Sequence, residues 1–221
     1  MNIIEWHKAF KVQLDTLDNQ GAIRLQPEVV DVFFNKAINK IMMDLYNEYE
    51  ETQEISDALS SQTIIKSIPS TSPVLNISST GFPNQLKIDL PPDYYHHLQS
   101  NATLTIGNSS NIVRTVKQLL DSESKVISNP FERADDTEVP IFFKAGAIYV
   151  YIPDNSTLTN FSLTYLKNPI KVAYKPSNNI AISSDIDEYL HERIINLAVI
   201  YALETYGSER TAAKVQIKDV N

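Results

Sequence analysis

The chain has 221 residues, 43% of them hydrophobic and 21% charged, proportions typical of a folded globular protein rather than a disordered one. It has no cysteine, which excludes disulfides and cysteine-ligated metal centres. Its net charge of −8 argues against a protein that binds nucleic acid by neutralising phosphates. Glu5 and His7 break the apolar run that a signal peptide would need, so we expect none at the N-terminus. No run of residues approaches the ~20 apolar residues of a membrane span. We therefore expect a soluble protein with no membrane partner, synthesised in a reducing cytoplasm.

Residues 1–59 are expected to form the N-terminal helices of a helical bundle. Apolar residues recur at helical spacing over 3–17, and a second helix is predicted from Pro27 to about residue 59. Pro27 suits the first helical turn, and Asp31 is favourably placed for the helix dipole. The apolar stripe of this second helix is wider than one packing partner requires, so part of it is predicted to contact another subunit. The candidate subunit-interface residues are Phe33, Phe34, Tyr46 and Tyr49.

Residues 60–176 are expected to form a β-rich insertion, because short β-branched runs alternate there with turn residues. The Lys144-Ala145-Gly146 step predicts a hairpin turn. The prolines after Leu90 predict a short helix over 90–99. The strands are predicted over residues 63–68, 85–90, 102–106, 111–117, 140–144, 147–152 and 160–166.

The C-terminal part, residues 177–221, is expected to supply the last bundle helix and an extended tail. Ser184 or Asp185 is the predicted cap of this helix, and Gly207 is its predicted end. The tail has too few apolar residues to pack on its own domain, so it is expected to dock on a partner through Val215, Ile217 and Val220. The predicted fold class is therefore α+β, a helical bundle from the N- and C-terminal helices with an inserted antiparallel β-rich domain.

No catalytic or cofactor-binding motif is present, so we expect neither enzymatic activity nor a cofactor nor a metal site. The chain has no P-loop, no GxGxxG, no GxSxG and no HExxH, and it has only five glycines for phosphate-binding loops. His96 and His97 lie beside Asp93, but adjacent histidines on a helix point about 100° apart and do not readily chelate one ion. The acidic cluster at Asp135 and Asp136 lacks the spaced oxygens and central glycine of a calcium loop.

Several segments of the chain resemble the head-to-tail connector proteins, also called adaptor or ring proteins, of short-tailed bacteriophages, including the crAss-like group. The Leu90-Pro91-Pro92-Asp93-Tyr94-Tyr95 step is similar to a turn common in that family. The resemblance continues in Asn129-Pro130-Phe131, in the segment from Pro140 to Pro153, and in the Tyr165-Leu166-Lys167-Asn168-Pro169 strand end.

The resemblance implies a structural virion protein at the portal vertex. Such a protein forms a homo-oligomeric ring of about twelve copies, contacts the portal protein and adjacent tail or ring proteins, and lets DNA pass through non-specifically. Acidic groups facing that channel would keep DNA from sticking. The candidate lumen residues are Glu50, Glu51, Asp135 and Asp136.

A second function, a bacterial or phage carbohydrate- or surface-binding module, is suggested by the eleven tyrosines, whose rings could stack on sugars. Most of these tyrosines lie at positions that helical or strand periodicity already assigns to a core or an interface. Assembly state distinguishes the two functions, because a glycan-binding monomer favours the second and a ring favours the first.

Overall fold

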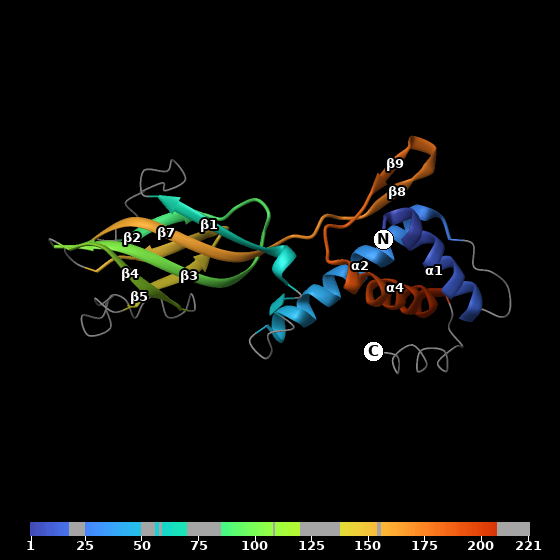
Figure 1. Ribbon diagram of the computed structural model, residues 1–221, viewed down its shortest axis with the longest axis horizontal. Helices are drawn as coiled ribbons and strands as arrows, with labels where there is room; N and C mark the ends of the chain where they lie inside the picture. Colours follow the sequence, from blue (N-terminus) through green and yellow to red (C-terminus); the bar gives the residue numbers. More distant parts are fainter. Residues whose placement is uncertain are drawn as a thin grey trace. The chain divides into compact units, whose positions relative to one another are not determined.

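A computed structural model describes residues 1–17, 25–49, 56–57, 59–69, 85–107, 109–119, 138–153 and 156–206 (Figure 1). The chain divides into two compact units. One unit, here called the helical unit, comprises Met1–Gln62 and Pro169–Asn221, and the other, the sheet unit, comprises Thr63–Asn168.

The helical unit contains α1 (Ile3–Leu17), α2 (Pro27–Asn47) and α4 (His191–Tyr206), together with a hairpin of β8 (Ala173–Lys175) and β9 (Ile180–Ile182). Pro27 opens α2 as predicted, and Asn2 caps α1 by accepting a hydrogen bond from Glu5 N. The predicted C-terminal helix is confirmed, although a short 3₁₀ turn at Glu188–Leu190 precedes it. Its buried face packs with α1 and α2 around Trp6, Phe10 and Phe34.

The second helix is shorter than predicted, because α2 ends at Asn47 rather than near residue 59. Glu48 directly follows the last residue of α2. A carboxylate at this position faces the negative end of the helix dipole and disfavours another turn.

The sheet unit is a single curled sheet in the strand order β1-β7-β3-β4-β5-β6-β2. The apolar side chains of its core include Ile88, Leu104, Ile141, Val150 and Phe161, all nearly inaccessible to solvent. The strands are β1 (Thr63–Pro69), β2 (Gln85–Asp89), β3 (Tyr94–Ile106), β4 (Ser109–Gln118), β5 (Glu138–Lys144), β6 (Ala147–Tyr151) and β7 (Ser156–Lys167).

The predicted fold class is wrong. The described structure is mostly a curled, mixed, seven-stranded half-barrel with three short helices, and not a helical bundle with an inserted β domain. The helices have only 15, 21 and 16 residues, whereas β3 and β7 have 13 and 12 residues and pair along most of their length. The sheet is also not purely antiparallel, because β4 and β5 run parallel. A long connection between them makes a parallel pair possible.

Two local predictions within the sheet unit have opposite outcomes. The hairpin turn between β5 and β6 is confirmed, with Ala145 and Gly146 both at positive φ, as a two-residue turn between right-twisted strands requires. The short helix predicted over residues 90–99 is wrong, since β3 starts at Tyr94. Aromatic residues there favour an extended backbone, and pairing with β7 provides the hydrogen bonds that a helix would have made locally.

Candidate functional site

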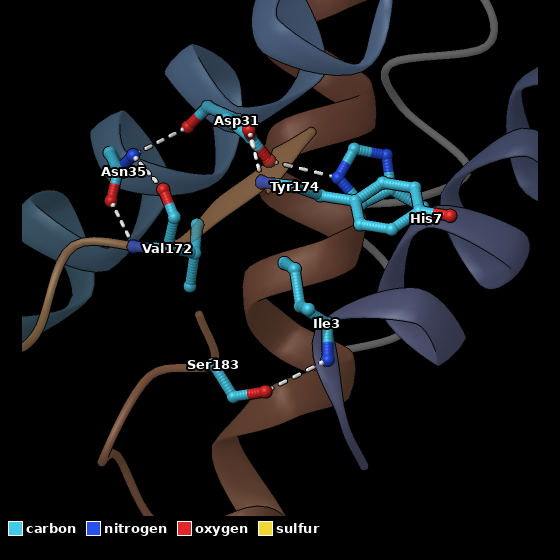
Figure 2. Close-up of polar contacts among 7 residues, drawn as sticks. All are labelled: Ile3, His7, Asp31, Asn35, Val172, Tyr174 and Ser183. Carbon is cyan, nitrogen blue, oxygen red and sulfur yellow. Dashed lines mark hydrogen bonds and ion pairs between the residues drawn. The ribbon is translucent and has the colours of Figure 1, made fainter. Parts of the chain in front are cut away.

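The most distinctive polar contacts of the helical unit join α2 to strand β8 (Figure 2). Asn35 Nδ2 donates a hydrogen bond to the carbonyl oxygen of Val172 at 3.1 Å, and Val172 N donates to Asn35 Oδ1 at 3.0 Å. Tyr174 N donates to Asp31 Oδ2 at 2.7 Å. Asp31 and Asn35 are four residues apart and therefore share one face of the helix. These two side chains, here called the Asp31–Asn35 clamp, bind the backbone of Val172, directly before β8, and of Tyr174 within it, as a neighbouring strand would.

Helix α1 supports the clamp from the other side. The imidazole Nε2 of His7 lies 2.9 Å from Asp31 Oδ1, and its ring packs 4.9 Å from the ring of Tyr174 (Figure 2). Only 7% of Asp31 is exposed, so this carboxylate is a buried acid with partners on both oxygens. A buried carboxylate is costly unless it is paired in this way. Beyond β9, Ile3 N donates to Ser183 Oγ at 3.0 Å. The base of the hairpin is thus attached to both α1 and α2.

The hairpin itself is largely exposed beyond this base. Its tip is a 3₁₀ turn at Pro176–Asn178, followed by Asn179 in the left-handed region at a φ of 55°. Lys175, Ala181 and Ile182 are all exposed. The hairpin thus has an attached base and an exposed tip, an arrangement that was not anticipated from the sequence.

The sheet unit has two open edges, formed by β1 and β2. Among the residues that the structure describes, no strand pairs with the outer side of either. Ile65 on β1 has 73% of its surface exposed, although β-branched residues usually pack on neighbouring side chains. Lys66 lies on β1, whereas Lys87 on β2 pairs with Asp89 of the same strand at 2.8 Å.

A cluster of aromatic and histidine side chains lies where β3, β5 and β7 meet. The Tyr94 ring lies 6.0 Å from that of Phe143 and 5.7 Å from that of Tyr165, and the His97 ring lies 5.1 Å from that of Phe143. Tyr165 donates its hydroxyl hydrogen to Asp93 Oδ1 at 2.9 Å. Burial, together with this hydrogen bond, raises the pKa of Tyr165 to about 12.

His96 and His97 are neighbours on β3. His97 Nδ1 lies 3.1 Å from Gln118 Oε1, and His97 Nε2 lies 2.8 Å from Ser100 Oγ, so both ring nitrogens have a polar partner. Burial lowers the pKa of both His96 and His97. Neighbouring side chains on a strand point to opposite faces, rather than about 100° apart as on the helix first expected there. No group of three or more metal-ligating side chains occurs in the described segments.

The four predicted subunit-interface residues lie on or just beyond α2 but do not form one exposed surface. Phe34 is inaccessible to solvent and contacts the rings of Trp6, His7 and Phe10. Phe33 is buried against the ring of Tyr206. Tyr46 and Tyr49 are half-buried. The stripe is wide because α2 contacts both α1 and α4 of its own chain, which accounts for Phe33 and Phe34 without a second subunit.

Other predicted site residues lie outside the described part of the chain. These are the candidate lumen acids Glu50, Glu51, Asp135 and Asp136, and the candidate tail-docking residues Val215, Ile217 and Val220.

The residues of the Asp31–Asn35 clamp were not identified as functional from the sequence. The only available signal was two polar residues spaced by four positions beside an apolar stripe. The sequence alone assigned Asp31 to the helix dipole, whereas the structure shows it binding His7 and the backbone of Tyr174.

Comparison with the models of known protein families finds no family that matches this chain. A comparison with curated proteins likewise finds no matching relative. None of the described helices is both long enough and apolar enough to cross a bilayer.

Proposed function

We propose that this chain is a structural protein of a bacteriophage virion that forms a ring at the portal vertex. The ring joins the capsid portal to the tail and extends the DNA channel. The proposal combines the family resemblance of the sequence with one structural observation, the two open and oppositely directed edges of the sheet.

The direction of the edge strands supports repeated contacts between identical copies. Of the six neighbouring strand pairs from β1 across to β2, five are antiparallel and one is parallel, so β1 and β2 run in opposite directions. If β2 of one copy lies beside β1 of the next, the new pair is therefore antiparallel. Such a contact joins two different surfaces, and a repeated contact of this kind closes into a ring when the rotation between copies allows it.

The same edges carry features that restrain association of free copies. Lys66 lies on β1, and Lys87 and Asp89 form an ion pair on β2. Charged side chains on edge strands are a common device against indiscriminate pairing. The protein is therefore expected to be monomeric or weakly associated alone and to form its ring on the portal, which holds copies side by side.

The negative net charge favours a channel through which DNA moves without binding tightly. The chain carries a net charge of −8, and duplex DNA repels a surface of that sign. The proposal assigns the lumen to Glu50, Glu51, Asp135 and Asp136. It predicts poor binding of duplex DNA by the isolated protein even at low salt, where attraction would be strongest.

The test is assembly with the portal protein encoded by the same genome. Sedimentation velocity and negative-stain microscopy should show small species for the chain alone and a ring-bearing complex for the mixture. Ile65→Lys adds a cation to edge strand β1 and should weaken assembly. Val113→Lys makes the same kind of change on interior strand β4, where Val113 is 60% exposed, and should leave assembly unchanged. A chain that never joins the portal would refute the proposal.

A further inference from the structure

The hairpin of the helical unit has the properties of a pre-formed binding arm. We define the arm as residues 170–182, which include β8, the tip and β9. Figure 1 shows this hairpin extending from the helices of its unit, with its tip away from them. Its base is attached by the Asp31–Asn35 clamp. The arm is therefore already ordered in the free subunit, so binding a partner costs less conformational entropy.

The outer edge of β9 presents backbone groups to a partner. Tyr174 is paired with Ala181, and Tyr174 N donates to Asp31 rather than across the hairpin. This pair is therefore of the non-hydrogen-bonded type, in which the backbone groups of both residues point away from the hairpin. The N–H and C=O of Ala181 consequently face outward, and in the described part of the chain β9 has β8 as its only strand neighbour.

The charge of the arm is opposite to that of the rest of the chain. Lys171 and Lys175 are its only charged residues, and both are exposed. Because the whole chain carries −8, the remainder carries −10 when the two charges of the arm are removed. A positively charged element on an acidic protein is attracted to another copy of the same protein.

The exposed side chains of the arm favour a protein partner over nucleic acid. Ile170 and Ile182 have 49% and 45% of their surfaces exposed, and apolar side chains gain nothing from phosphates. Two lysines are also fewer than the roughly 6–10 phosphate contacts of a strong DNA-binding surface. Apolar side chains with a small number of cations instead suit an acidic protein surface.

We propose that the arm docks on the acidic surface of the neighbouring copy of this chain. This inference rests on the proposed ring, in which every copy has a neighbour at a fixed position. That arrangement raises the effective concentration of the acidic surface near each arm. The contact is between two different surfaces, as a ring requires.

The experiment uses the full chain assembled with its portal protein. Lys171→Glu combined with Lys175→Glu should weaken association between copies about tenfold, since two exposed charge contacts become repulsive. The matched control is Lys8→Glu combined with Lys11→Glu, which makes the same charge change on the exposed face of α1 and should have little effect.

A contact map provides the second measurement. Because the chain has no cysteine, Ser177→Cys introduces a single thiol at the arm tip that can carry a benzophenone crosslinker. Irradiation should crosslink one copy to another, with the products identified by mass spectrometry. The same label at Asn39→Cys on the exposed face of α2 is the control position.

The outcomes separate the arm from the ring. If rings form but the double charge reversal has no effect and the label at residue 177 joins no second copy, the arm proposal is overturned and the ring proposal stands. A label that attaches to the portal protein alone, or an arm that retains duplex DNA, also overturns it. If no ring forms under any condition, it is the proposed function that fails.

Discussion

The Asp31–Asn35 clamp is the contact whose removal should be most informative. Asn35→Ala deletes both side-chain partners of Val172, a residue that is almost completely buried, and leaves its N–H and C=O without hydrogen bonds. Each unsatisfied buried polar group costs roughly 1–3 kcal/mol. Asn35 is only half-buried, so water can replace part of the loss. We expect the free energy of unfolding of the helical unit to fall by about 2–4 kcal/mol.

The chain offers a specific probe and a matched control for this measurement. Trp6 is the only tryptophan, and it is buried in the helical unit, so its fluorescence during urea unfolding reports on that unit. Asn39→Ala makes the same substitution at an exposed position of α2 and gains the same roughly 0.5 kcal/mol of helix propensity. The difference between the two variants therefore measures the clamp. Equal unfolding midpoints for Asn35→Ala and Asn39→Ala would refute the reasoning.

Three further results are expected. Trypsin should cleave after Lys171 slowly in the native protein and at least several-fold faster in Asn35→Ala, because release of β8 exposes the cleavage site; equal rates would show that the clamp does not hold the strand. Burial lowers the pKa of His191, so the unfolded chain, whose histidine titrates near 6.5, binds a proton first as pH falls. Stability of the helical unit should therefore be fully present above pH 6.5 and decline below it, and His191→Gln should make that decline shallower, as followed by Trp6 fluorescence at pH 5–8. Tyr165→Phe should lower the stability of the sheet unit by about 1–3 kcal/mol, measured by circular dichroism, because the phenol donates to a carboxylate.

The local structure that could be predicted from the sequence depends on residues close together in the chain. The turn at Ala145 and Gly146 was predictable because a two-residue hairpin requires positive φ, which glycine adopts readily. The buried face of α4 was predictable because Ile194, Ala198 and Ala202 repeat at helical spacing.

The parts that could not be predicted depend on distant partners. Residues 90–99 contain two prolines that suit a helix start, yet pairing of β3 with β7, about seventy positions away, makes the segment extended. The fold class was wrong because the described structure is mostly a curled mixed sheet with short helices, and strand pairs such as parallel β4 and β5 leave no local mark in either strand. The clamp joins Asn35 to Val172, 137 positions away, so neither sequence segment identifies the other.

The clamp also explains why the arm has a free edge. A hairpin of two three-residue strands is too small to be stable alone, so β8 needs a partner on its outer side. A third strand there would extend the sheet, whereas the side chains of Asp31 and Asn35 satisfy the backbone of β8 from the surface of a helix. In the described part of the chain this arrangement leaves β9 with β8 as its strand neighbour and no strand on its outer side. The His7 ring, packed on Tyr174, and the Ser183 hydroxyl, bonded to Ile3, attach the base of the hairpin to α1. Weakening the clamp should therefore release the arm before it disturbs the helices, so Asn35→Ala should impair docking between copies under conditions in which the fluorescence of Trp6 is still native.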